Sequence, residues 1–433
     1  MYQRFCNILF LALICSFYIS GCNIIQPGDK EGFDGRLLIW HPFEGKEAEA
    51  IKIILDKYRE LYPKIQIISE FFPEDKISEQ FRQKSQAGLG PDLMISSYQD
   101  LIPLIRVGVL KTLNDYNLDL SSYLPRPIGQ VTYKDKLYGL PFSLNTQVLC
   151  YNKTKVERPL NTLPEMMAEI DAKRQIAQTS SFLDTFWGVQ VFQHPTPTRN
   201  KKEIERIVDF PAWANWLEWL RLVKKNPNFI LADESASLDQ VFAEGKLAYY
   251  ICKSEDISNL QATLGEDKFG ITTLPSAGNR SAGPLLFTKA IVFNRISSQS
   301  TTKLALQLAR FLTNAEQQTI LALETQSLIP VNKKVQLDRR LSPIQAVLFA
   351  QSKTAVAVDL DFIYEYEGAD KIYGDLYYNL VMSGEMMPQE AASEFTQKIL
   401  DFEQNSPSRE NLLKKAWVDL PQKVRLMTQR LSR

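Results

Sequence analysis

The sequence predicts an α/β fold in which helices cover mostly parallel sheets. Apolar strand-like runs alternate with amphipathic helical segments in the first part of the chain. This alternation is typical of βαβ units, whose strands pair in parallel. In such sheets a ligand site belongs in the loops beyond the carboxyl ends of the strands.

The predicted elements follow one another without long gaps. They are a strand at residues 36–40, a helix at 46–61, a strand at 65–68, a helix at 77–87 and a strand at 92–96. The first helix carries apolar residues at helical spacing and stops before Pro63, because proline cannot continue a helix. The loops that face a ligand therefore begin at Trp40 and at Ser96.

A third helix is predicted further along the chain. Its apolar residues repeat at helical spacing and are Trp213, Trp216, Leu217, Leu220 and Val223. Such a stripe is typical of a helix packed on a sheet. We therefore expect these tryptophans in the core rather than against a ligand.

The chain begins with an export signal. Arg4 precedes an apolar run at residues 8–19, which is shorter than the roughly 20 residues that span a bilayer. Ser20 and Gly21 before Cys22 resemble the lipobox of bacterial lipoproteins, in which the cysteine is acylated and becomes the new N-terminus. We expect a signal peptide at 1–21, and a lipidated end with a flexible linker at 22–33. An ordinary secretory signal cleaved nearby is the alternative.

Charge and composition fit a folded body outside the cytoplasm. The 433 residues contain 50 basic and 50 acidic side chains, so the sequence offers no electrostatic case for nucleic acid. No second apolar run after Cys22 reaches membrane length. The lipid on Cys22 would hold the protein on the outer face of the cytoplasmic membrane.

Two cysteines remain outside the signal and the lipid site. Cys150 and Cys252 each lie in a strand-like apolar run. They are either two buried free thiols or one disulfide, which an oxidising compartment permits. The sequence does not decide between these states.

Nine segments, in this order, carry a resemblance to a known family. They are 40–45 (WHPFEG), 90–96 (GPDLMIS), 107–113 (VGVLKTL), 138–142 (YGLPF), 149–153 (LCYNK), 159–165 (PLNTLPE), 242–248 (FAEGKLA), 269–275 (FGITTLP) and 309–317 (ARFLTNAEQ). Together they cover nearly all of the mature chain. The chain resembles bacterial extracellular solute-binding proteins of the maltose-binding type.

The resemblance implies a two-lobed periplasmic-binding-protein fold of type II, with crossing strands between the lobes. Lobe 1 would comprise residues 34–142 and 286–340, and lobe 2 residues 143–285 and 345–433. A monomer would trap a small solute, a sugar or oligosaccharide, as the lobes close. The membrane subunits of an ABC importer would receive it. The sequence has no phosphate-binding Gly-rich motif, so this chain is not the ATPase.

The resemblance also points to ligand-binding residues. Sugar sites combine aromatic platforms with planar polar side chains. The expected groups follow predicted strands or fall near a late aromatic of the family: Trp40, His41, Ser96, Ser97, Tyr98, Asn145, Gln147, Lys253, Ser254, Glu255, Tyr364, Tyr366 and Tyr373. Glu365 adjoins the last group. Each has a structural alternative as a core, turn or solvated residue.

Other functions stay open at this point. A ligand sensor that presents its closed form to a membrane receptor or kinase would have the same fold. A lipid-anchored glycoside hydrolase would need two opposed carboxylates about 5 to 10 Å apart, and the sequence shows acids without that arrangement. With two histidines and no clustered cysteines, we expect no metal and no cofactor. The solute itself could be an oligosaccharide, a monosaccharide, a polyol or a phosphorylated glycerol derivative.

The lipobox gives the first testable prediction. Cys22→Ser removes the thiol that accepts lipid, so the variant should remain unprocessed by the lipoprotein pathway or be released as soluble protein. Labelled fatty acid should enter the wild-type chain and not the variant. A wild-type chain that never takes up the label contradicts lipidation at Cys22.

Overall fold

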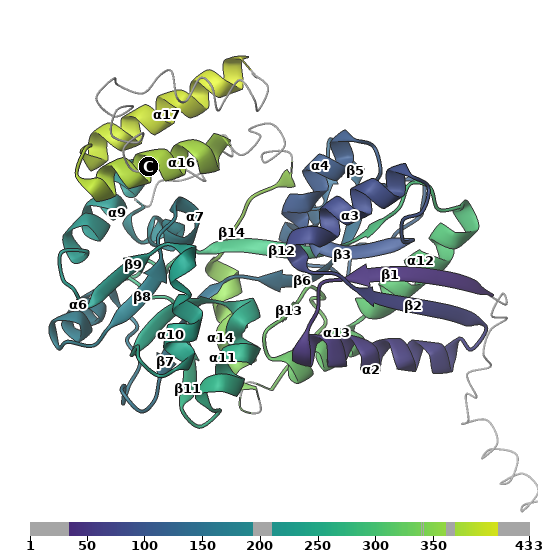
Figure 1. The fold of residues 1–433 in the computed structure, drawn as a ribbon, viewed down its shortest axis with the longest axis horizontal. Helices are drawn as coiled ribbons and strands as arrows, with labels where there is room; N and C mark the ends of the chain where they lie inside the picture. Colours follow the sequence, from purple (N-terminus) through teal and green to yellow (C-terminus); the bar gives the residue numbers. More distant parts are fainter. Residues whose placement is uncertain (1–33, 194–209, 339, 341, 361–368, 406–433) are drawn as a thin grey trace, which may run out of the picture.

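A computed structural model describes residues 34–193, 210–338, 340, 342–360 and 369–405. The described chain forms two lobes, each built around its own sheet, and strands pass between them (Figure 1). The signal peptide and the whole segment 22–33, including Cys22, lie outside the described residues, as do Tyr364 and Tyr366.

The first lobe contains a sheet of seven described strands. Their order is β13-β6-β12-β3-β1-β2, and β14 pairs with β12. The strands are β1 (Gly35–His41), β2 (Ile65–Phe71), β3 (Leu93–Ser97), β6 (Gly139–Asn145), β12 (Leu285–Phe293), β13 (Ile329–Pro330) and β14 (Val356–Ala357). β1 pairs in parallel with β2 and β3, as the βαβ pattern predicts, whereas β12 runs antiparallel to β3 and β6.

The predicted helices of this lobe form and pack as expected. α2 (Gly45–Leu61) buries its apolar stripe, including Ile54 and Tyr58, which are fully buried. α3 (Glu74–Gln86) begins three residues earlier than predicted, directly after Pro73. Glu74 and Asp75 occupy its first turn, where negative charge interacts favourably with the helix dipole.

Further helices and one hairpin complete the first lobe. They are η1 (Tyr98–Asp100), α4 (Leu101–Arg106), α5 (Pro125–Gly129), α12 (Gln299–Leu312), α13 (Ala315–Thr325) and the strands β4 (Thr132–Tyr133) and β5 (Lys136–Leu137). α13 packs against α2, and α12 packs against β1. This covering leaves the carboxyl end of β3 directed toward the second lobe (Figure 1).

The second lobe has a sheet of five described strands in the order β11-β7-β10-β8-β9. The strands are β7 (Gln147–Asn152), β8 (Ile176–Thr179), β9 (Phe229–Ala232), β10 (Tyr249–Lys253) and β11 (Phe269–Thr272). β8 is parallel to β9 and β10, and β7 is antiparallel to β10 and β11. Both sheets are therefore mixed rather than mostly parallel as predicted, because the strands that connect the lobes run against the parallel strands of each sheet.

Helices surround this second sheet. They are α6 (Leu163–Asp171), α7 (Phe182–Thr185), η2 (Phe186–Gly188), η3 (Gln190–Phe192), α9 (Phe210–Val223), η4 (Glu234–Ala236), α10 (Leu238–Ala243), η5 (Ser254–Asp256), α11 (Ile257–Leu264), α14 (Pro343–Thr354), α16 (Ala369–Ser383) and α17 (Pro388–Asn405). α6 begins with a capping box in which Thr162 and Glu165 each bond the other's backbone N–H. This motif fixes the start of the helix.

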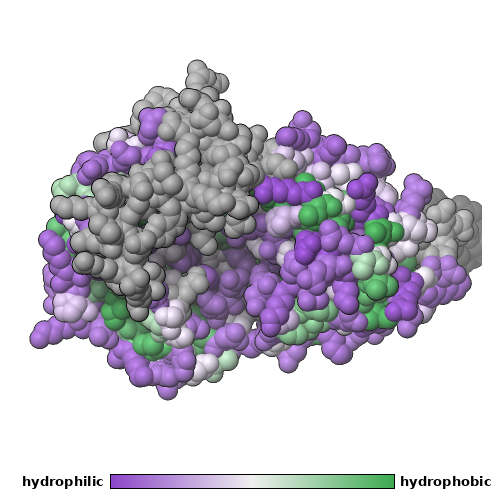
Figure 2. Space-filling model, turned by 45° about the horizontal axis from the view of Figure 1, so that its top comes forward, coloured by the Kyte–Doolittle hydropathy of each residue, from purple (hydrophilic) through white to green (hydrophobic). Residues whose placement is uncertain are grey.

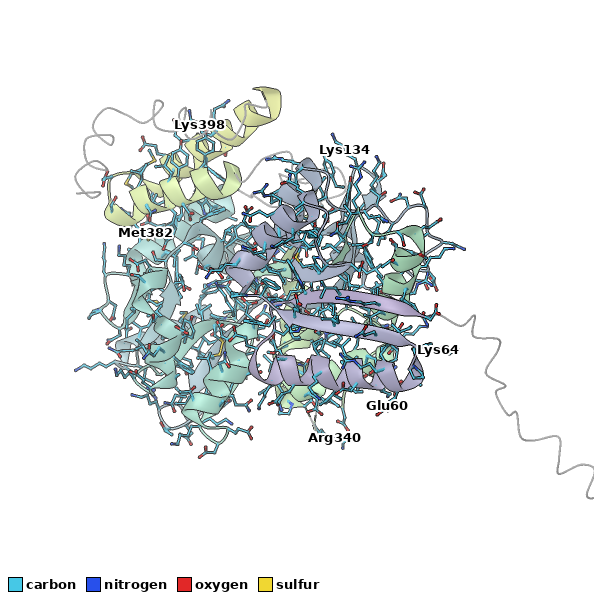
Figure 3. The ribbon with its side chains drawn as sticks, turned by 45° about the vertical axis from the view of Figure 1, so that its right-hand side comes forward. Glu60, Lys64, Lys134, Arg340, Met382 and Lys398 are labelled. Carbon is cyan, nitrogen blue, oxygen red and sulfur yellow. A yellow bond between two sulfur atoms is a disulfide. The ribbon has the colours of Figure 1, made fainter. Side chains whose placement is uncertain are left out.

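Aromatic packing holds α9, α16 and α17 together. The stripe on α9 is buried as predicted, with Trp213 and Trp216 at most 2% exposed. Phe395 of α17 lies 4.9 Å, between ring centroids, from Trp213. Figure 3 labels Met382 on α16 and Lys398 on α17, the two helices that stack at one end of this lobe.

The chain changes sheets at Thr146, which separates β6 from β7. Its backbone N–H donates to Ser254 Oγ at 3.1 Å, and its carbonyl accepts from the Ser254 N–H at 2.8 Å. Its hydroxyl donates to the Leu285 carbonyl at 2.9 Å. All three residues are buried, so the crossing is held to the second lobe and to β12. The predicted lobe boundary at 142/143 falls within β6, and the exact division remains a proposal.

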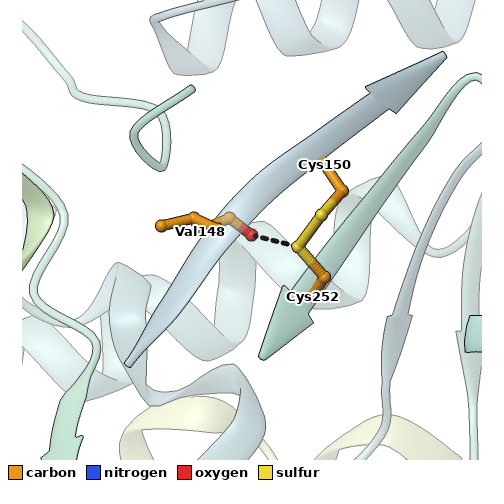
Figure 4. Close-up of a disulfide and its surroundings, with 3 residues drawn as sticks. All are labelled: Val148, Cys150 and Cys252. Carbon is orange, nitrogen blue, oxygen red and sulfur yellow. Dashed lines mark hydrogen bonds between the residues drawn. A yellow bond between two sulfur atoms is a disulfide. The ribbon is translucent and has the colours of Figure 1, made fainter. Parts of the chain in front are cut away.

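The two cysteines that the sequence left open are paired in the structure. Cys150 of β7 and Cys252 of β10 form a disulfide with Cα atoms 5.9 Å apart (Figure 4). They are diagonal neighbours, since Cys252 lies opposite Val148 and Cys150 lies opposite Tyr250. The Cys252 sulfur lies 3.6 Å from the Val148 carbonyl oxygen, the contact drawn in Figure 4. The bridge therefore ties together β7, which begins directly after Thr146, and β10, whose last residue lies opposite Gln147.

The visible surface is mainly hydrophilic, with scattered hydrophobic residues (Figure 2). Within the described ranges, no helix is both long and apolar enough to cross a membrane.

The disulfide gives a prediction about stability. The bridge closes a loop between cysteines 102 positions apart, so the Cys150→Ala, Cys252→Ala double variant should lose about 3 to 5 kcal/mol of unfolding free energy. Urea unfolding measures this loss. Reduction of the wild-type protein should produce a similar loss and leave the double variant unchanged. Equal stability of oxidised and reduced wild-type protein would show that the thiols do not pair.

Candidate functional site

A cavity of about 1060 Å³ lies between the lobes, and we call it the cleft. Its described lining comes from both sheets and from the crossing strands: Glu74, Asp75, Ser97, Gln99, Asp100, Asn145, Thr146, Gln147, Thr179, Ser180, Ser181, Leu183, Asp184, Asp233, Ser235, Lys253, Glu255, Phe287, Thr288, Lys289, Asp375 and Asn379. The volume is at the upper end of the range for small-molecule sites.

The first lobe contributes residues from two adjoining places. Ser97 ends β3, and Gln99 and Asp100 follow in η1. The Ser97 Oγ accepts from the Gln99 N–H at 3.4 Å, which helps to set this turn. Glu74 and Asp75 open α3. Polar side chains thus reach the cleft where a parallel strand ends, as the strand rule predicts.

The second lobe contributes a wall built in the same way. Thr179 ends β8, and Ser180 and Ser181 follow it. The Ser181 side chain caps α7 by accepting from the Asp184 N–H at 3.0 Å. The Phe182 N–H at the same helix start donates to Asp375 Oδ1 of α16 at 2.8 Å. The Ser181 hydroxyl also donates to Asp184 Oδ2 at 2.8 Å, so the carboxylates of Asp184 and Asp375 are both held at this short helix.

The crossing strand contributes two amide side chains. Asn145 Nδ2 donates to Glu255 Oε2 at 2.7 Å, and Gln147 Nε2 donates to the Asp184 carbonyl at 3.0 Å. Asn145 is 6% exposed, and its Oδ1 has no hydrogen-bond partner among the described residues. A buried amide oxygen without a hydrogen-bond partner favours a ligand that supplies a donor to it.

A buried lysine joins the two walls. Lys289 of β12 has a side chain 5% exposed, and its Nζ donates to both carboxylate oxygens of Glu74 at 2.6 Å. The same Nζ lies 3.8 Å from Glu255 Oε2 on the second lobe. Burial by itself lowers the pKa of Lys289, but the negative charges of Glu74 and Glu255 outweigh it and hold the pKa above its usual value. Lys289 therefore stays protonated.

Three carboxyl groups in and around the cleft have raised pKa values. Burial, followed by the charge of Glu74, raises the pKa of Asp100 to about 7. Burial raises the pKa of Glu47 on α2 to about 7, although Lys289 opposes the shift. Burial, with the neighbouring charge of Glu255, raises the pKa of Asp256 to about 7. These shifts indicate that negative charge is crowded and poorly hydrated in this region.

The cleft brings five of the expected ligand residues together. They are Ser97, Asn145, Gln147, Lys253 and Glu255. Ser254 lies between two of them but is fully buried, and it bonds Thr146 instead. Whether the five residues contact a solute remains a prediction.

Other expected residues lie outside the described lining. The Trp40 indole N–H donates to Glu70 Oε2 at 2.8 Å, and its ring packs on Phe72 at 4.0 Å. The His41 Nδ1 accepts from the Phe43 N–H at 3.2 Å. Burial lowers the pKa of His41 to about 4, so this ring is neutral at pH 7.

The remaining expected residues are buried beside these elements. Ser96 is fully buried in β3, and Tyr98 is 2% exposed, with its ring centroid 6.2 Å from that of the cleft residue Phe287. Tyr373 is 3% exposed in the core of the second lobe. Contacts of these three side chains with a solute remain predictions.

Sequence reasoning missed most of the acidic lining. Three lining residues lie at strand ends: Thr179 is the last residue of β8, Ser180 follows it, and Asp233 follows β9. The strand-end rule could therefore have found them. Lys289 interrupts an otherwise apolar strand, which signals a buried charge. Asp375 and Asn379 lie on a helix near the end of the described chain, and no local pattern marks them.

Among the described residues, no group of three or more His, Cys, Asp and Glu side chains is arranged to hold a metal ion.

Comparison with known protein families shows which family the chain belongs to. Residues 54–346 match the family described as bacterial extracellular solute-binding protein. The chain belongs to this family. A solved structure that is 17% identical, the GacH receptor of Streptomyces glaucescens, matches with a TM-score of 0.68 over 86% of this chain and 99% of that one. The predicted two-lobed α/β fold is thereby confirmed.

Two curated relatives match shorter parts of the chain. The maltotriose-binding protein of Pyrococcus abyssi is 28% identical over 134 residues, which are 30% of this chain and 29% of the relative. The galactooligosaccharide-binding protein of Bacillus subtilis is 25% identical over 181 residues, which are 41% of this chain and 42% of the relative. The matches span less than half of the length of either relative.

The raised pKa of Glu47 gives a pH prediction. The folded chain holds a proton on Glu47 that the unfolded chain releases as the pH rises from about 4.5 to 7, so this group lowers stability across that window. Glu47→Gln keeps the acceptor for the Ser327 hydroxyl, which lies 2.8 Å away. Its stability relative to the wild type should rise by about 2 kcal/mol between pH 4.5 and pH 7.5.

Chemical unfolding at several pH values measures this difference. The matched control is Glu49→Gln, an exposed position on the same helix. Its pH profile should follow that of the wild type. Parallel profiles for Glu47→Gln and the wild type would contradict a raised pKa at Glu47.

Proposed function

We propose that this protein is the solute-binding subunit of an ABC importer, and that it captures a carbohydrate between its two lobes. The cleft lined by hydrogen-bonding groups of both lobes is the observation that carries this proposal. A solute that bonds both walls favours the closed arrangement, because only that arrangement offers all of its contacts at once.

The lining chemistry supports a carbohydrate. Hydroxyl, amide and carboxylate side chains predominate, and Phe287 supplies one aromatic face. Sugars present many hydroxyls and apolar C–H faces, which these groups match. The two curated relatives are named for binding maltotriose and galacto-oligosaccharides. These names support a carbohydrate as the solute of this chain.

The proposal includes partners and location. The closed, loaded monomer would dock on the importer's membrane subunits, which pass the solute inward. A lipid on Cys22 would hold the protein at the outer face of the cytoplasmic membrane, in the periplasm or extracellular space. Cys22 lies outside the described residues, so this part rests on the sequence alone.

We further propose that the protein releases its solute unchanged. The relatives are binding proteins rather than enzymes. The carboxylates of Asp184 and Asp375 on the second lobe already accept protein hydrogen bonds, from the Ser181 hydroxyl at 2.8 Å and from the Phe182 N–H at 2.8 Å. This use suits positioning of a ligand better than proton transfer.

The proposal predicts that single exposed residues on either wall affect affinity. A thermal-shift screen of maltotriose, galacto-oligosaccharides and other sugars should first identify a binding solute. Gln99→Ala on the first lobe and Asn379→Ala on the second should each weaken its binding about threefold to tenfold, since each removes about one hydrogen bond. Titration calorimetry measures the affinities.

Gln389→Ala is the matched control, because this glutamine is exposed on α17 outside the described lining. Its affinity should equal that of the wild type. A solute recovered cleaved or modified would establish catalysis, and loss of affinity from one wall only would contradict capture between two lobes.

A further inference from the structure

We propose that the cleft selects a carbohydrate that carries an amine, and so a positive charge, over neutral and anionic sugars. This inference rests on the proposed function, because it assigns a charge to the solute held in the same cleft.

The charge of the described lining is strongly unbalanced. Among the described lining residues there are seven carboxylates, two lysines and no arginine: Glu74, Asp75, Asp100, Asp184, Asp233, Glu255 and Asp375, with Lys253 and Lys289. The raised pKa of Asp100, about 7, keeps this carboxyl mostly protonated at pH 6.5, so the other six carboxylates and the two lysines leave an excess of about four negative charges. The whole chain is neutral, so the excess is a local property of the cleft. A cavity lined by one sign of charge concentrates solutes of the opposite sign.

The buried lysine is already occupied by protein groups. Lys289 Nζ binds both oxygens of Glu74 and lies near Glu255, so it offers little charge to a bound anion. This ion pair neutralises the Glu74 carboxylate. It does not neutralise the acids on the second wall. An anionic solute, such as a sugar phosphate, would meet unfavourable electrostatics in this cavity.

Negative charge faces the cleft from both lobes. Asp75 stands on the first wall, and Asp184 and Asp233 stand on the second. When the two walls approach each other with little water between them, repulsion between their negative charges opposes closure. A cation placed between them removes this penalty, so it would couple binding to closure. A neutral sugar would leave the repulsion in place.

The unpartnered acceptor points the same way. Asn145 lines the cleft with its side chain almost fully buried, and its Oδ1 has no partner among the described residues, while its Nδ2 is taken by Glu255. An ammonium group provides three donors and no acceptor. It therefore satisfies both the amide oxygen and the carboxylates beside it.

The rest of the lining distinguishes an amino sugar from a simple polyamine. Ser97, Gln99, Thr179 and Asn379 line the cleft with hydroxyl and amide groups, which can bond the hydroxyls of a sugar ring. A polyamine has no hydroxyls to use them. The combination of acids and neutral polar groups favours a solute with both an amine and several hydroxyls.

Two trimers of matched size test this inference. The glucosamine trimer carries free amines, and the N-acetylglucosamine trimer is neutral; spermidine serves as a cation without hydroxyls. Calorimetry on the purified full chain at pH 6.5 should show the glucosamine trimer binding at least tenfold more tightly than the acetylated one. The preference should shrink as ionic strength rises from about 0.05 to 0.5 M, because salt screens charges.

Two exposed lining acids provide variants that should keep the fold. The double variant Asp75→Asn, Asp233→Asn removes one charge from each wall and should lose most of the preference. Asn at 233 can still accept the Ser235 N–H bond, which is 3.0 Å long. The matched control is Asp119→Asn, because Asp119 accepts an equivalent bond from the Ser121 N–H at 2.8 Å outside the cleft lining. It should retain the preference.

The outcomes separate this inference from the proposed function. Equal or tighter binding of the neutral trimer overturns the charge preference and leaves carbohydrate capture intact. Binding of spermidine without either trimer supports a cation-selective cleft and contradicts the carbohydrate. Binding of none of the three overturns the charge preference, and carbohydrate capture is then decided by the separate screen of maltotriose, galacto-oligosaccharides and other sugars.

Discussion

The structure depends on one crossing point in the backbone. Only Thr146 separates the last residue of β6 in the first sheet from the first residue of β7 in the second. Its hydrogen bonds to Ser254 and Leu285 are buried, where an unmade bond would be costly. The crossing strand cannot shift by one residue without exchanging buried and cleft-facing side chains. The position of Asn145 and Gln147 at the cleft follows directly from this constraint.

Several other features support the same point. The disulfide joins β7 to β10 beside the crossing, and β10 leads into Lys253, Ser254 and Glu255. Glu255 in turn bonds Asn145 and lies near Lys289. The disulfide thus fixes β10 within the second lobe, and the Asn145–Glu255 hydrogen bond and the Lys289–Glu255 ion pair connect that lobe to the first. That arrangement suits rotation of one lobe against the other about the crossing strands.

Local patterns predicted the elements well and the cleft only in part. Apolar periodicity located β1, α2, β2 and the core stripe of α9, because burial on one face imposes a regular spacing. The strand-end rule placed Ser97 at the cleft, and the family resemblance placed Lys253 there. The strand-end rule also suggested Trp40, yet the indole of this residue bonds Glu70 and packs on Phe72. An aromatic side chain at the end of a strand can turn toward the cleft or toward the core. Glu70 and Phe72, the partners that decide the direction of Trp40, are distant in the sequence.

The acidic character of the cleft could not be read from local sequence. Glu74, Asp184 and Asp375 are far apart along the chain and line one cleft only because α3 packs on β1 and β3 in the first lobe and α16 packs on α7 in the second. Composition hid the imbalance, since basic side chains elsewhere bring the total to neutrality. The pairing of Cys150 with Cys252 was likewise undecided until the register of β7 and β10 was known.

The central claim is that a solute is held between two lobes that move together on binding. Small-angle X-ray scattering on the protein with and without its solute tests this claim most directly. The account predicts a smaller radius of gyration for the loaded protein than for the free protein, because contacts to both walls favour closure. A solute that binds at saturation and leaves the radius of gyration unchanged would contradict it.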